Sequence, residues 1–105
     1  AHVLVPALDP DLPATLSPYV MNDILRLELG FTGVLMSDDL DMKAISERYP
    51  IDKAALLCVD AGIDQILVCH SLDAQKKTLA TLRKCPPSRL GQSLDRIETM
   101  ARKVL

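Results

Sequence analysis

The strongest constraint on the fold is a glycine-then-strand pattern that occurs twice in the chain. Residues 29–38 (LGFTGVLMSD) align with residues 61–70 (AGIDQILVCH) at a spacing of 32 residues. In each copy a helical segment ends at a glycine, and a short, continuously apolar run follows. Such a run is typical of a strand buried on both faces, and a period near 32 matches one βα unit. The pattern predicts an α/β fold with parallel strands and right-handed crossovers.

Helix caps and apolar spacing predict the other elements. Strands are expected at 33–36 and 66–69, with the apolar segment 1–6 as a third, so the sheet has two to three parallel strands. Four helices are expected. The first is capped by Ser17 and ended by Gly30, and the second covers 53–61, capped by Asp52 and ended by Gly62. The third runs from Ser71 to about Lys84, and the fourth follows the break at 85–88 with an apolar stripe as far as Val104. The proline-rich stretch between 6 and 13 is expected to be a loop.

The carboxyl ends of the two predicted strands carry Asp38 and His70, which occupy equivalent positions in the repeat. Function gathers at this end of parallel α/β folds, and both side chains are expected at one cleft. Asp38, Asp39 and Asp41 also place three carboxylates within four residues, where a βα turn needs one capping Asp. Helix capping, a magnesium-binding aspartate cluster and a carboxylate nucleophile or acid each account for the cluster. For His2 and His70, the alternative to a functional role is a structural hydrogen bond.

Composition limits the class of protein. The 105 residues are 49% apolar and carry 12 Lys plus Arg against 14 Asp plus Glu. We expect one folded domain over residues 1–105, with no nucleic acid or membrane as partner. Three cysteines without a CxxC pattern predict reduced, mostly buried thiols. No signal-peptide pattern and no apolar stretch long enough to span a membrane is seen in these residues, so we expect a cytoplasmic location. Because the chain starts at Ala1 and leads straight into an apolar segment, we expect it to be part of a longer protein.

Several longer motifs carry a resemblance to a known family. They are residues 1–3 (AHV), 25–34 (LRLELGFTGV), 37–45 (SDDLDMKAI), 60–64 (DAGID) and 93–97 (SLDRI). In this order and spacing they resemble family 3 glycoside hydrolases, specifically the bacterial β-N-acetylhexosaminidase branch. The resemblance runs over nearly the whole chain but covers only the last third or so of the family's catalytic domain. It implies a C-terminal fragment of a (β/α)8 TIM-type barrel, made of the closing βα units.

The resemblance also implies a reaction. Asp38 is then the nucleophile of a retaining, two-step hydrolysis of terminal β-linked N-acetylglucosamine, as in peptidoglycan recycling. Asp39 is its neighbour, not its substitute. His2 aligns with a histidine lining the sugar site, whereas His70 matches only by strand position; both are candidate substrate-binding residues. Neither a metal nor an organic cofactor is expected.

One part of the family's machinery has no counterpart among these residues. The acid/base of this branch is a histidine paired with an aspartate on a loop that precedes the matched region. We therefore expect this chain alone to be a poor catalyst, and to form homo-oligomers or to pair with the missing barrel portion through its open strand edges. Two other functions stay open: a non-catalytic sugar-binding or assembly module derived from this fold, and a magnesium-dependent phosphoryl-transfer or receiver-like domain.

Overall fold

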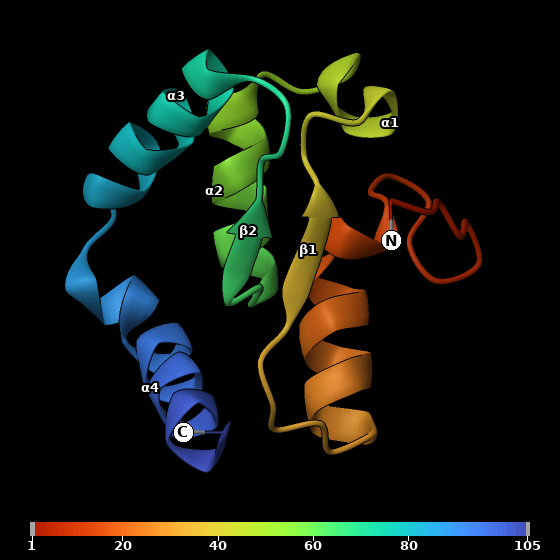
Figure 1. Ribbon diagram of the computed structural model, residues 1–105. Coiled ribbons are helices and arrows are strands. Elements are labelled where there is room, and N and C mark those ends of the chain that lie inside the picture. Colours follow the sequence, from red (N-terminus) through yellow and green to blue (C-terminus); the bar gives the residue numbers. More distant parts are fainter. Residues whose placement is uncertain (1, 105) are drawn as a thin grey trace.

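The structure is a computed structural model and describes residues 2–104. Two short parallel strands form its centre, and helices surround them (Figure 1). Helix η2 runs alongside β1, while α3 and α4 lie on the β2 side. This arrangement confirms the predicted α/β class. The elements in chain order are η1 (Ala14–Leu16), η2 (Tyr19–Glu28), β1 (Met36–Asp39), α1 (Lys43–Ser46), α2 (Ile51–Ala61), β2 (Gln65–Leu67), α3 (Leu72–Arg83) and α4 (Pro87–Val104).

Strand β1 begins later than the sequence predicts. It pairs with β2 from Met36 opposite Gln65 to Asp39 opposite Leu67, so the expected strand at 33–36 is wrong by about three residues. The apolar residues before Met36 use their backbone groups elsewhere. The Leu35 amide donates to the Asp64 carboxylate at 2.9 Å, and the carbonyl of Leu35 accepts from the Asp64 and Gln65 amides. The ladder therefore falls on the polar residues that follow, and Asp38 lies inside the strand.

The expected N-terminal strand is absent from residues 2–6. The Val3 carbonyl instead accepts from the Ala14 amide at 2.8 Å, because the proline-rich loop folds back on this segment. The loop is held by Asp9, whose carboxylate accepts from the Ser17 hydroxyl at 2.7 Å. The sheet within residues 2–104 thus has two strands, the lower of the two numbers expected.

The four long helices occur where the sequence predicts them, but one cap is wrong. Ser71 caps α3 by accepting from the Ala74 amide, and Gly62 ends α2 with a φ of 87°, in the left-handed region that favours glycine. Helix α2 begins one residue before Asp52, whose carboxylate accepts from the adjacent Lys53 amide and does not cap the helix. Pro50 has the N-cap position there and makes no side-chain hydrogen bond to the helix.

Helix α4 does not bury its apolar stripe. No residue of α4 is buried, and Leu94 and Val104 are 61% and 76% exposed. Polar contacts join the helix to the rest of the molecule: Ser93 and Arg96 bind Asp64, and Arg89 forms an ion pair with Asp60. No helix within residues 2–104, α4 included, has the length and apolarity needed to cross a membrane.

The core lies between α2, the short helix α1 and the start of η2. Its fully buried members include Leu16, Leu40, Ile45 and Cys58. Burial raises the pKa of the Cys58 thiol to about 12, so this cysteine is a packing residue. All three cysteines are free thiols, but the expectation that most are buried is wrong, because Cys69 is exposed and Cys85 is half-buried.

Candidate functional site

Asp38 lies next to the end of β1, where the sheet meets the loops. Alternation along the strand places it on the face opposite Ser37 and Asp39, both of which are buried. Asp38 itself is half-buried. Within residues 2–104 its carboxylate accepts a hydrogen bond only from the adjacent Asp39 amide, at 2.9 Å. Asp38 is therefore the least engaged of the strand-end carboxylates.

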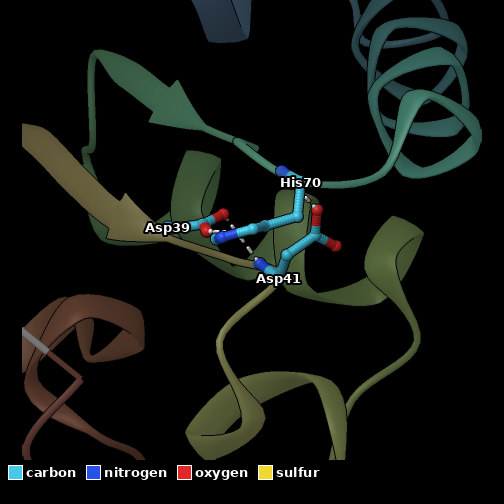
Figure 2. Close-up of side chains that lie close together, drawn as sticks. All are labelled: Asp39, Asp41 and His70. Carbon is cyan, nitrogen blue, oxygen red and sulfur yellow. Dashed lines mark hydrogen bonds and ion pairs between the residues drawn. The ribbon is translucent and has the colours of Figure 1, made fainter.

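Asp39 is the most engaged residue of the strand end (Figure 2). Its Oδ1 accepts from the Asp41 and Cys69 amides, each at 3.0 Å. Its Oδ2 lies 2.7 Å from Nδ1 of His70. Burial acts to raise the pKa of Asp39, but these hydrogen bonds outweigh it and hold the pKa below its usual range. The carboxylate thus joins the end of β1 to the loop after β2.

His70 comes from the loop after β2, as predicted, but it pairs with Asp39 and not with Asp38. Its side chain is 78% exposed and its ring points toward the Asp39 carboxylate in Figure 2. The backbone is held separately, since the amides of His70 and Ser71 both donate to Oδ2 of Asp41, at 3.2 and 2.9 Å. The His70 ring is therefore oriented from two sides.

His2 reaches the same strand end from the N-terminal segment. Its Nε2 lies 2.8 Å from the carbonyl oxygen of Asp39, and its Nδ1 is buried without a hydrogen-bond partner in the described chain. His2 also lines a cavity of about 360 Å³ together with loop and α1 residues. Asp39 therefore connects all parts of the site: it follows Asp38 in the chain and contacts both histidines.

Among the residues that the structure describes, Asp39, Asp41 and His70 form a group that could hold a metal ion. One ligand atom from each lies within 4.8 Å of the others. Hydrogen bonds already account for this closeness, because Asp39 binds the His70 ring and Asp41 binds the His70 amide. The geometry needs no ion to explain it.

The exposed thiol of Cys69 lies among the same carboxylates. Desolvation, and then the negative charges of Asp39, Asp41 and Asp38, raise the pKa of Cys69. A thiol in this surrounding is held protonated and is a weak nucleophile at neutral pH. Cys69 contributes its backbone amide to the site and not its sulfur chemistry.

A buried ionic cluster forms around Asp64, at the amino ends of the two strands. The fully buried carboxylate binds Arg26 at 2.7 Å, Arg96 at 3.0 Å and the Ser93 hydroxyl at 2.6 Å. It thereby connects η2, the start of β2 and α4. Sequence reasoning missed both this role and that of Asp39, although Arg26 and Asp64 lie within the quoted motifs and a charged residue beside a buried strand is a signal of pairing.

A parallel sheet with polar side chains gathered at the carboxyl ends of its strands defines a class of α/β proteins that use this edge for their ligands. Comparison with known proteins narrows the class. Residues 1–100 match the family described as glycosyl hydrolase family 3 N terminal domain. The chain therefore belongs to glycoside hydrolase family 3, and the resemblance noted in the sequence is confirmed.

Curated relatives and solved structures agree with this assignment. A β-hexosaminidase of Alkalilimnicola ehrlichii is 43% identical over 82 residues, which are 78% of this chain and 23% of the relative. A β-hexosaminidase of Chromobacterium violaceum is 37% identical over 97% of this chain and 28% of its own length. The family 3 β-N-acetylglucosaminidase of a Paenibacillus species superposes with a TM-score of 0.90 at 40% identity, over 97% of this chain and 21% of that one. The chain thus spans roughly a quarter of the length of these relatives.

Proposed function

We propose that this chain is the nucleophile-bearing part of a retaining hydrolase that acts on terminal β-linked N-acetylglucosamine. The observation that carries the proposal is the state of Asp38. Asp39 and Asp41 use their carboxylates to join the strand ends, whereas among the described residues 2–104 Asp38 accepts only from its neighbour's amide. A half-buried carboxylate at the carboxyl end of a strand, with an oxygen left for a ligand, suits nucleophilic attack.

The chemistry follows from the charge of Asp38. A carboxylate nucleophile acts in its ionised form. The carboxylate stabilises the oxocarbenium-like transition state and then bonds to the anomeric carbon, while the leaving oxygen takes a proton from a general acid. Water next hydrolyses the glycosyl ester, and the two displacements retain the anomeric configuration. His2 and His70, which contact the neighbouring residue Asp39, are the sugar-binding residues in the proposal.

The general acid is expected to come from barrel residues outside this chain. A retaining glycosidase needs its second catalytic group about 5–5.5 Å from the nucleophile. Nδ1 of His70 lies 2.7 Å from the Asp39 carboxylate, and Nε2 of His2 lies 2.8 Å from a backbone carbonyl, so both rings already have partners. We therefore propose that residues 1–105 are the closing βα units of a barrel and that they turn over substrate slowly on their own.

The wider role is part of the same proposal. The related proteins are named β-hexosaminidase and β-N-acetylglucosaminidase, which are enzymes that act on carbohydrates. We propose a carbohydrate substrate of the cell-wall type, a cytoplasmic role in peptidoglycan recycling, and no metal or organic cofactor.

Covalent labelling tests the proposal directly. The chain, combined with the complementary barrel portion of a relative, is incubated with a 2-deoxy-2-fluoro or equivalent mechanism-based sugar and digested for peptide mass mapping. We expect the adduct on Asp38. Sugar binding without any adduct would favour the non-catalytic module, and an adduct on Asp39 or Asp41 would overturn the nucleophile assignment.

A further inference from the structure

Asp39 contacts the two histidines of the strand end through two different acceptor groups. Its backbone carbonyl lies 2.8 Å from Nε2 of His2, and its carboxylate lies 2.7 Å from Nδ1 of His70. Asp39 therefore contacts both rings, one through its backbone and the other through its side chain. The protonation of each ring depends on which of these groups it meets.

The tautomer of His2 follows from the carbonyl. A carbonyl oxygen only accepts, so Nε2 of His2 must carry the proton of this hydrogen bond. In the neutral ring the buried Nδ1 is then the atom that holds a lone pair. This assignment rests on the backbone of Asp39 and is independent of its side chain.

The tautomer of His70 follows from the carboxylate. The pKa of Asp39 is lowered, since amide and imidazole hydrogen bonds outweigh its burial, and the ionised group can only accept. Nδ1 of His70 therefore carries the proton, and the neutral ring has its lone pair on Nε2. The His70 side chain is 78% exposed, so a ligand can approach the ring from solvent.

The Asp39 carboxylate is itself fixed in orientation. Oδ1 accepts from the amides of Asp41 and Cys69, so Oδ2 has little freedom to rotate away from His70. The His70 backbone is fixed by Asp41 in turn. The ring cannot exchange its two nitrogens without breaking the bond to Asp39.

We propose that Asp39 is a positioning residue that holds His70 in its Nδ1-protonated form and so presents Nε2 as a hydrogen-bond acceptor for a sugar hydroxyl. The ligand class rests on the proposed function, because sugars are rich in hydroxyl donors. The role of Asp39 rests only on the geometry of the strand end. Asp39 is thus distinct from its neighbour Asp38, which meets the reacting carbon in the proposed reaction.

The test is the tautomer of each ring, read from long-range ¹H–¹⁵N NMR spectra of the full chain near neutral pH. In the wild-type chain we expect Nδ1–H for His70 and Nε2–H for His2. Asp39→Asn retains an oxygen for the two amides but places an NH₂ group against His70, so the His70 proton should move to Nε2. His2 should stay unchanged, because its partner is the backbone carbonyl.

Asp41→Asn is the matched control. Its carboxylate binds the His70 amide and not the ring, so the tautomer should stay as in the wild type. The unchanged His2 signals report that the strand end of each variant remains folded. A wild-type His70 in the Nε2–H form, or a tautomer that Asp39→Asn leaves unchanged, would overturn the positioning role whatever the variants' stability.

The second arm titrates N-acetylglucosamine into the same samples. We expect the ¹⁵N shift of His70 Nε2 to move on binding, and Asp39→Asn to weaken binding about fivefold, the loss expected for one hydrogen bond of about 1 kcal/mol. If the tautomer result holds and the sugar leaves His70 unmoved, the acceptor role is wrong. If Asp38 is nevertheless labelled by the mechanism-based sugar, the proposed function stands without it.

Discussion

Arg26 and Asp64 form a buried ion pair, with a nitrogen–oxygen distance of 2.7 Å and a carboxylate that has no exposed surface. Arg26 also donates to the carbonyls of Gly33 and Gly62, so it ties η2 to the segments that lead into both strands. Asp64 in turn binds Leu35, Ser93 and Arg96. This pair therefore links the segments that lead into β1 and β2.

Removing the carboxylate should be costly. Asp64→Ala leaves the nearly buried Arg26 without its counter-charge and should lower the free energy of unfolding by about 3–5 kcal/mol. Urea denaturation followed by circular dichroism measures the change. The exposed pair of Asp60 with Arg89 is the control, and Asp60→Ala should cost no more than about 1 kcal/mol. Equal losses from the two variants would contradict the central role of Asp64.

Acid should weaken the fold through the same residue. Burial acts to raise the pKa of Asp64, but the hydrogen bonds from Ser93, Leu35 and Arg96, then the charge of Arg26, hold it below its usual range. A lowered folded pKa contributes stability above the unfolded value of about 3.9 and loses it as the pH falls through the folded value. The unfolding free energy should therefore fall below about pH 4, and Asp64→Asn should flatten this decline. An identical pH slope in both proteins would contradict the linkage.

Asp38 should dominate turnover in a completed barrel. Asp38→Ala removes both the covalent bond and the negative charge at the transition state, so kcat should fall by several orders of magnitude while sugar binding survives. Asp39→Asn should cost much less, because it alters local geometry and the His70 tautomer only. Steady-state kinetics with a chromogenic N-acetylglucosaminide measures both. Near-normal turnover by Asp38→Ala would refute its assignment as nucleophile.

Magnesium should leave the thermal stability unchanged. Asp39 and Asp41 already accept hydrogen bonds from the loop after β2, and an ion would have to displace the His70 ring. A ligand that binds the native state raises the melting temperature with its concentration. Differential scanning calorimetry with and without magnesium should therefore give the same midpoint. A saturable rise would favour the phosphoryl-transfer alternative.

The chain studied alone should associate. A two-stranded sheet leaves an outer edge on each strand, and Met36 on β1 is 56% exposed. Light scattering should find a dimer or larger assembly, and Met36→Lys should shift it toward monomer. Glu28→Lys, a change on η2, is a control that should leave the assembly unaltered. A wild-type monomer at high concentration would contradict the expectation.

Local sequence signals determined most of the elements. Glycines at the ends of η2 and α2, the Ser71 cap and the repeated apolar runs predicted four helices and two parallel strands in the correct order, because caps and periodicity act within a few residues. The motif around Asp38 also led to the correct family. These signals could not predict which residues of β1 and β2 pair, because an apolar run indicates burial and does not show which backbone groups form hydrogen bonds.

Only the tertiary structure decided which polar residues meet. The repeat placed Asp38 and His70 at equivalent strand ends, yet His70 pairs with Asp39 at 2.7 Å. Which carboxylate meets His70 depends on the register of β1 against β2 and on the alternation of side chains along β1. Likewise Asp64 finds Arg26 and Arg96 across gaps of 38 and 32 residues. Such contacts depend on the three-dimensional packing of distant segments, and no local pattern encodes them. The sequence by itself determined the elements and the family; packing decided that Asp39 and Asp64 organise the site.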